Sequence, residues 1–190
     1  MKRYTGEEVF SFNGNDLGKM TLSFWSWAYS ELESNILRSA LAEYIVALAL
    51  DITENADECY RKTWRPYDLG FMGRRIEVKS ASTVQAWETR HKGKYTFSIA
   101  PASLPNENDN YEENAPKQRN SDVYVFAIFE PKGEEVNPLN LDGWHFVVIS
   151  TRVLDENMPL QKTISMPSLL RLDPIETDFA GLKSAVLSCI

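Results

Sequence analysis

The chain has 190 residues, 43% of them apolar and 25% charged, with a net charge of −7. This composition excludes a disordered chain and predicts one compact domain over residues 1–190. No segment has the roughly 20 uncharged apolar residues of a membrane span, and no apolar run follows the N-terminal positive charges, so we expect no membrane association and a cytoplasmic location. The cysteines and histidines (Cys59, Cys189, His91, His145) are too scattered for a usual zinc site.

A long helix is the clearest predicted element of the first third of the chain. Ser30 and Glu33 have the spacing of a capping box, and residues 36–50 are rich in Leu, Ala and Ile without Gly or Pro. The run is nearly all apolar after Ser39, which predicts burial on most sides. Glu43 is then an anomaly, because an ionised carboxylate is rarely buried without a partner. It lies either at a helix edge, where it reaches water or a neighbouring arginine, or in a functional site.

A strand hairpin is predicted after this helix. Residues 58–70 are typical of a strand and a turn, and residues 74–81 of a second strand, joined by a tight connection at Gly70 and Gly73. A helix or turn is expected over residues 82–90.

The remainder of the chain predicts further strands and two closing helices. The strands are expected at residues 94–102, 122–129 and 144–150. Residues 105–116 are polar and acidic, which indicates an exposed, mobile loop. A short helix is expected after Ser150 and an amphipathic helix from about Thr177 or Asp178. These elements amount to an α/β sandwich with a mixed sheet.

The hairpin carries a pattern of charged residues with chemical meaning. Period-two alternation places Ile76 and Val78 on one face of the second strand and Glu77 and Lys79 on the other. Asp68 precedes this strand and supplies a second carboxylate. Phosphodiester hydrolysis uses a divalent ion held by such oxygen ligands, with a cation to stabilise the charge on the phosphate. The alternative is a surface Glu–Lys ion pair that contributes well under about 1 kcal/mol to the stability of the fold.

The same hairpin lies in a basic segment of an otherwise acidic chain. Residues 61–94 contain nine Lys and Arg residues and three acidic ones. Such a segment indicates a phosphate-facing surface, in which Arg74, Arg75, Lys92 and Lys94 neutralise backbone phosphates. An ordinary solvated face is the alternative.

Residues 67–82, YDLGFMGRRIEVKSAS, resemble the active-site core of the PD-(D/E)xK nuclease superfamily, which includes the restriction endonucleases. The likeness extends from Phe24 to about Leu172, and is closest to small bacterial members. It implies a restriction-endonuclease-like, three-layer sandwich in which helices flank a central mixed sheet. The residue before the motif aspartate is Tyr67 instead of proline, a departure that affects the turn.

The resemblance also implies roles for individual residues. Asp68 and Glu77 would bind Mg²⁺, for which Mn²⁺ would substitute, and Lys79 would be the catalytic lysine. Glu43 would match the helix glutamate that many members add to the metal shell, and Gln85 a glutamine that supports the site. The expected activity is cleavage of nucleic acid, most simply by an endonuclease acting on double-stranded DNA, with a homodimer placing one site on each strand.

An alternative from another class is a nuclease-fold binding or scaffold subunit inside a larger nucleic-acid-processing or defence complex. The acidic remainder of the chain and its acidic loop fit a protein partner. Binding of Mg²⁺ or Mn²⁺ by the isolated chain distinguishes the two hypotheses.

Overall fold

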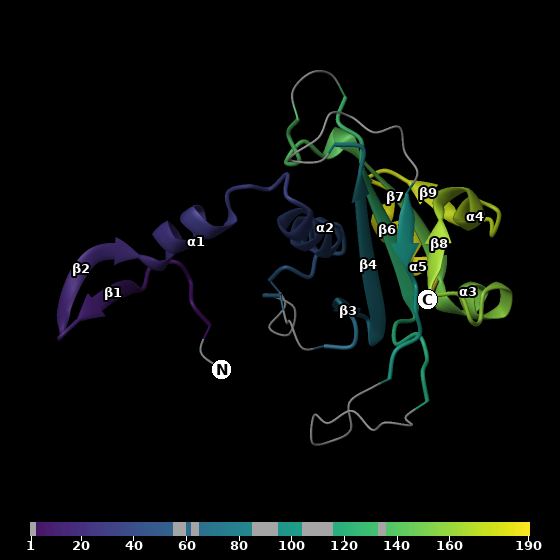
Figure 1. Cartoon of the computed structure of the whole chain (residues 1–190), viewed down its shortest axis with the longest axis horizontal. Helices are drawn as coiled ribbons and strands as arrows, with labels where there is room; N and C mark the ends of the chain where they lie inside the picture. The colour runs from purple at the N-terminus through teal and green to yellow at the C-terminus, as the bar shows by residue number, and fades with distance from the viewer. Residues whose placement is uncertain (1–2, 55–59, 62–64, 85–94, 104–115, 133–135) are drawn as a thin grey trace.

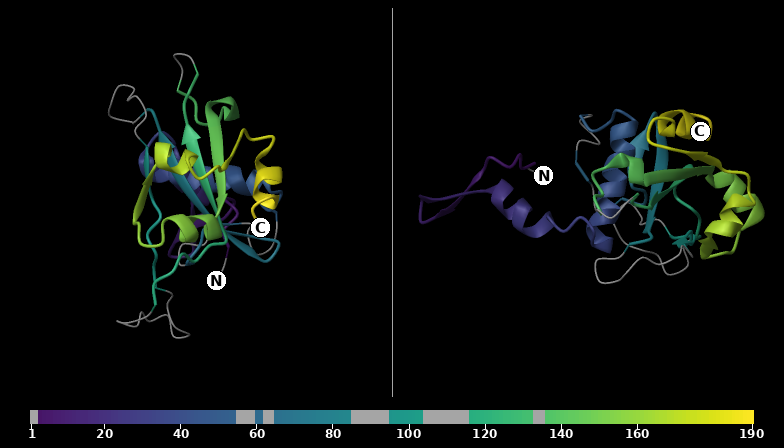
Figure 2. Two further views of the ribbon diagram at one scale, coloured as in Figure 1. Left: turned by 90° about the vertical axis from the view of Figure 1, so that its right-hand side faces the viewer. Right: turned by 90° about the horizontal axis from the view of Figure 1, so that it is seen from above.

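The computed structural model describes residues 3–54, 60–61, 65–84, 95–103, 116–132 and 136–190. They form a layered body and an N-terminal arm that projects from it, drawn in purple in Figure 1. In the body, helices flank a central sheet, as the two further views in Figure 2 also show. The predicted mixed α/β architecture is confirmed.

The central sheet has five strands, in the spatial order β3 (Leu69–Phe71), β4 (Arg74–Ser82), β6 (Val123–Phe129), β7 (Trp144–Ser150) and β9 (Ile175–Thr177). β4 and β6 run parallel, and the other neighbouring pairs are antiparallel. The sheet is therefore mixed, as predicted.

β6 lies at the centre of the sheet because its sequence is apolar throughout. All seven of its residues are buried, as expected for a strand that is covered on both faces. Alternate residues serve two separate cores: Val125 faces the first and Phe126 the second.

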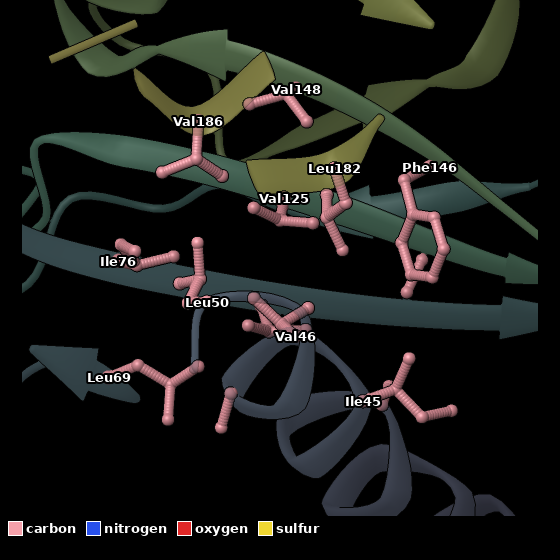
Figure 3. Close-up of a cluster of buried hydrophobic side chains, with 14 of the residues drawn as sticks. Ile45, Val46, Leu50, Leu69, Ile76, Val125, Phe146, Val148, Leu182 and Val186 are labelled. Carbon is pink, nitrogen blue, oxygen red and sulfur yellow. The ribbon is translucent and has the colours of Figure 1, made fainter. Parts of the chain in front are cut away.

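Two helices cover the first face of the sheet, α2 (Asn35–Ala49) and α5 (Leu182–Leu187). Figure 3 shows Val46 of α2 and Leu182 of α5 among the side chains of this core, with Ile76 of β4 and Val125 of β6. All four side chains are completely buried.

The second face is covered by a strand ribbon and two short helices. The elements are β5 (Thr96–Ser98), β8 (Thr163–Ser165), α3 (Thr151–Asn157) and α4 (Met166–Leu170). Phe97, Ile164 and Leu169 pack there around Phe126. A one-turn helix, η1 (Leu141–Gly143), leads into β7.

The N-terminal arm, residues 3–29, consists of a hairpin and one helix. The elements are β1 (Val9–Phe12), β2 (Asn15–Met20) and α1 (Thr21–Tyr29). The hairpin turns at Asn13 and Gly14, both with positive φ (50° and 78°), and Asn-Gly is the preferred dipeptide for such a two-residue turn.

The predicted start of the long helix is wrong. α2 begins at Asn35, and the side chain that accepts a hydrogen bond from its first turn belongs to Ser34, from the N–H of Leu37 at 3.4 Å. Ser30 instead follows the last residue of α1. Residues 30–34 form a turn that separates α2 from α1, a helix that was not predicted.

Other boundaries also differ from the prediction. Among the described residues of 58–70, only Leu69 and Gly70 belong to a strand, and the tight turn lies at Met72 and Gly73 instead of at Gly70. The C-terminal helix begins at Leu182, because residues 175–177 pair with β7 as β9.

The short helix after Ser150 is confirmed as α3. In the part of the chain that the structure describes, no helix is long and apolar enough to cross a membrane. The predictions for residues 85–90 and for nearly all of the loop at 105–116 lie outside the described residues, as do Cys59 and His91. Cys189 is a half-buried free thiol.

Candidate active site

The β3–β4 hairpin positions Asp68 beside Glu77. Leu69 pairs with Ile76, and continuing this register by one residue puts Asp68 opposite Glu77. The N–H of Asp68 donates to the Ile76 carbonyl at 3.0 Å. Its carboxylate Oδ2 accepts the N–H of Val78 at 2.8 Å. The Asp68 side chain thus takes the place of a strand partner just before β3 begins.

Glu77 and Lys79 lie on the same face of β4, as predicted. Ile76 and Val78 are buried in the core under α2, so Glu77 and Lys79 point to the opposite face. Their side chains are 19% and 29% exposed, and the Lys79 ammonium donates to Glu77 Oε1 at 2.5 Å. The pair is therefore more enclosed than an ordinary surface ion pair.

The electrostatic setting of Asp68 indicates a crowded acidic site. Burial, reinforced by the charge of Glu77, raises the pKa of Asp68 from 3.8 to about 7. Glu43 acts in the same direction, while the Val78 N–H and the Lys79 charge oppose the rise in pKa. Because like charges in a partly dry setting disfavour ionisation, a bound cation would stabilise the ionised form of Asp68.

Glu43 lies on α2 and is 7% exposed. Arg61 holds both of its oxygens, with Nε at 2.5 Å from Oε2 and Nη2 at 2.6 Å from Oε1. The hydrogen bond with Glu43 is the main cause that raises the pKa of Arg61. Of the two alternatives for Glu43, the structure contains the arginine pair, and the role as a metal ligand stays a prediction.

A small cavity of about 80 Å³ lies next to this pair, with Glu43, Arg61 and Asp68 in its lining. Tyr44 of α2 and Leu69 of β3 also line it. Glu43 and Asp68 therefore face a common space, although they belong to different elements.

The predicted metal ligands are Asp68, Glu77 and Glu43. Among the residues that the structure describes, no three Asp, Glu, His or Cys side chains gather closely enough to hold a metal. Mg²⁺, however, is usually held by one or two carboxylates, with water and substrate phosphates completing its shell. Asp68 and Glu77 supply two carboxylates at one hairpin, and magnesium binding by them stays a prediction.

Two of the four predicted phosphate contacts can be placed. Arg74 and Arg75 open β4 and are exposed. Arg74 approaches Asp122 at 3.9 Å, and the Arg75 guanidinium lies over the ring of Tyr67 at 5.7 Å. Arg65 lies over the same ring at 5.2 Å, so arginines gather around the residue that precedes Asp68. Gln85, Lys92 and Lys94 lie outside the described residues.

Sequence reasoning missed two residues that contact or neighbour Glu77. Ser121 is 5% exposed, and its hydroxyl donates to Glu77 Oε2 at 3.3 Å. Tyr124 is opposite Glu77 in the parallel register of β4 and β6; burial, followed by the charge of Glu77, raises its pKa. No local signal marks either residue, because the register is set across more than forty residues of intervening chain.

Comparison of the chain with protein-family models, with curated proteins and with solved structures found no match. The interpretation of the site therefore depends on its residues and their geometry.

Proposed function

We propose that the chain is a divalent-metal-dependent nuclease of the PD-(D/E)xK type, with a restriction-endonuclease-like fold. The observation that carries the proposal is the meeting of Asp68, Glu77 and Lys79 at the β3–β4 hairpin. Asp68 is bonded to the backbone of β4 at 2.8 Å, and the Glu77 charge contributes to its raised pKa. Two carboxylates forced together in a partly buried setting are unfavourable unless a cation or proton is shared between them.

In this proposal Asp68 and Glu77 hold Mg²⁺ or Mn²⁺. When bound, the ion supplies a Lewis acid for the phosphate and lowers the pKa of a water molecule. Lys79 stabilises the negative charge that develops on the phosphate, or orients the attacking water, from a position within hydrogen-bond distance of Glu77. Ser121 holds the second oxygen of Glu77 and so keeps its carboxylate in one orientation.

The substrate proposed is nucleic acid, with double-stranded DNA first. Arg74 and Arg75 are exposed at the start of β4, on the strand that carries Glu77 and Lys79. Guanidinium groups suit phosphate, because their planar donors match its oxygens. Arg65 and Arg75 over Tyr67 extend this basic surface toward Asp68.

The test is a cleavage assay with the purified full chain. Plasmid, linear duplex, single-stranded DNA and RNA are each incubated with Mg²⁺, Mn²⁺ or EDTA. We expect nicking or linearisation of plasmid with either metal and none with EDTA. Glu77→Gln, purified in the same way, controls for a contaminating nuclease. Cleavage at the same rate by Glu77→Gln, or no cleavage of any substrate, contradicts the proposal.

The second candidate is a nuclease-fold scaffold subunit. It is favoured by one observation: two carboxylates near Asp68 have both oxygens hydrogen-bonded to protein groups. Arg61 binds both oxygens of Glu43. Lys79 and Ser121 each bind one oxygen of Glu77. Such a network is stable without a metal. Calorimetric titration of the metal-free chain with Mn²⁺ separates the candidates, because a scaffold would show no binding.

A further inference from the structure

The N-terminal arm has no core of its own. α1 buries none of its nine residues, and every residue of β1 and β2 is exposed. The exposed side chains nevertheless include five large aromatic ones, Phe10, Phe12, Phe24, Trp27 and Tyr29. A segment of this composition is costly to leave in water, and large exposed apolar surface marks an interaction site.

The apolar surface of the arm has the size of a protein interface. The five aromatic side chains are between 42% and 84% exposed, which amounts to roughly 600 Å² at about 200 Å² for each fully exposed ring. Exposed aliphatic side chains on the same elements bring the total to roughly 800 Å², the area that each partner contributes to an interface of standard size.

The turn between α1 and α2 is hydrogen-bonded to the body, and the arm meets its own body near Tyr60 and Arg61, which line a cavity with Phe10 and Phe24. Ser34 caps α2, and Arg38, which is 4% exposed, donates to the Glu33 carbonyl at 2.8 Å and to the Val84 carbonyl at 3.3 Å. Asn35 accepts a further hydrogen bond from Arg38 at 2.5 Å. The turn is thereby tied to α2 and to the segment that follows β4, and the arm extends outward in Figure 1 and in the right view of Figure 2.

The outer face of α2 carries a matching apolar stripe. Ile36, Tyr44 and Leu48 are 83%, 56% and 40% exposed, and with Ala40 they follow one another at intervals of four residues. Residues at this spacing lie on one side of a helix. The stripe lies on the side of α2 opposite the core residues Ile45 and Val46, and its middle borders the cavity that Arg61 and Asp68 line.

We propose that the chain forms a homodimer by arm exchange, in which the arm of each copy covers the outer stripe of α2 in the other. Both surfaces are present on every copy, so the contact closes with twofold symmetry. A monomeric wild type would instead indicate that the arm folds back onto its own helix. This inference stands independently of the proposed nuclease activity.

The test measures the mass of the full chain by sedimentation equilibrium. Wild type should have twice the chain mass of 21.7 kDa at micromolar concentration. Trp27→Glu on the arm and Tyr44→Glu on α2 should each weaken the dimer by at least about tenfold, since buried aromatic anchors dominate interfaces. Leu160→Glu, at an 87% exposed site on the body, is the matched control and should leave the dimer unchanged. Circular dichroism verifies that each variant is folded.

Mixing the two weakened variants tests the exchange itself. A mixed dimer contains one intact contact, between the arm of the Tyr44→Glu chain and α2 of the Trp27→Glu chain, so association should recover above that of either variant alone. A monomeric wild type, a dimer unaffected by Trp27→Glu, or the absence of recovery on mixing overturns the proposal.

Discussion

Two acid–base pairs lie within electrostatic range of Asp68, and they are built differently. On the α2 side, Arg61 binds both oxygens of Glu43 through two nitrogens. On the β4 side, Lys79 binds one oxygen of Glu77 through a single ammonium. A guanidinium holds a carboxylate at two points, whereas an ammonium is a point donor on a flexible stem. The difference suggests a structural role for Glu43–Arg61 and identifies Glu77–Lys79 as the pair that a ligand can open.

The largest expected effect is on catalysis, through Lys79. Lys79→Ala should lower the rate of metal-dependent DNA cleavage by about 10²–10⁴-fold, because it removes a charge that acts on the transition state. Asp68→Asn and Glu77→Gln should lower it by at least as much. The rate is measured by single-turnover cleavage of a labelled duplex.

Lys132→Ala is the matched control, since Lys132 is exposed and lies outside the site. Wild-type cleavage by Lys79→Ala would show that the Glu77–Lys79 pair is not catalytic and remove the distinction between the two pairs.

The second effect is stabilisation by metal. Mg²⁺ or Mn²⁺ should raise the melting temperature of the wild type, because the ion binds the folded chain only; at one hundred times the dissociation constant the gain is about 2.7 kcal/mol. Asp68→Asn should lose most of this gain. Scanning calorimetry with and without each ion measures it, with Ca²⁺ as a non-catalytic comparison. An unshifted wild type at millimolar ion would favour the scaffold candidate.

A smaller effect, on the stability of the metal-free chain, distinguishes Glu43 from Glu77. Glu43→Gln should lower the free energy of unfolding by about 1–2 kcal/mol, because Arg61 loses a charged partner but is exposed enough to be rehydrated. Glu77→Gln should leave the stability of the metal-free chain unchanged or raise it, since it removes repulsion on Asp68. Urea unfolding in EDTA compares them. If Glu77→Gln instead destabilises the chain more than Glu43→Gln does, and Glu43→Gln no longer gains stability from metal, Glu43 is the ligand.

The smallest expected effect is the pH dependence that Asp68 confers on stability. The unfolded aspartate loses its proton near 3.8 and the folded one near 7, so the folded chain holds the extra proton between these values. Its free energy of unfolding should therefore fall as pH rises from about 4 to about 7. The asparagine of Asp68→Asn cannot ionise, so this variant should lack this pH dependence of stability. Equal pH profiles of wild type and variant in EDTA would contradict the raised pKa.

The body of the fold was largely predictable from sequence because the local pattern of each element indicates its type. The apolar run of α2, the alternation of β4 and the continuous apolar run of β6 each predicted the element that the structure contains. The arm was not predicted, since hydrophobic patterning assumes that apolar residues are covered by the same chain. Asn13-Gly14 was the one local signal for it.

The candidate site was predictable only where its residues share one hairpin. Asp68, Glu77 and Lys79 are brought together by a two-residue turn, which sequence can indicate. Glu43 and Arg61 meet across the packing of α2, and Ser121 reaches Glu77 through a parallel strand register. Such contacts depend on tertiary packing, which leaves no periodic trace in the sequence.

The hydrogen bond from Val78 to Asp68 also bears on solubility. β3 pairs with β4 only as far as Ile76, and in the described part of the chain no other strand pairs with that edge beyond this point. An uncovered strand edge recruits strands from other molecules. On the edge of β4, the first backbone donor beyond Ile76 is the Val78 N–H, and the Asp68 carboxylate accepts its hydrogen bond. Asparagine can keep that bond and alanine cannot, so an inactive Asp68→Asn protein should stay dispersed at concentrations where Asp68→Ala begins to aggregate.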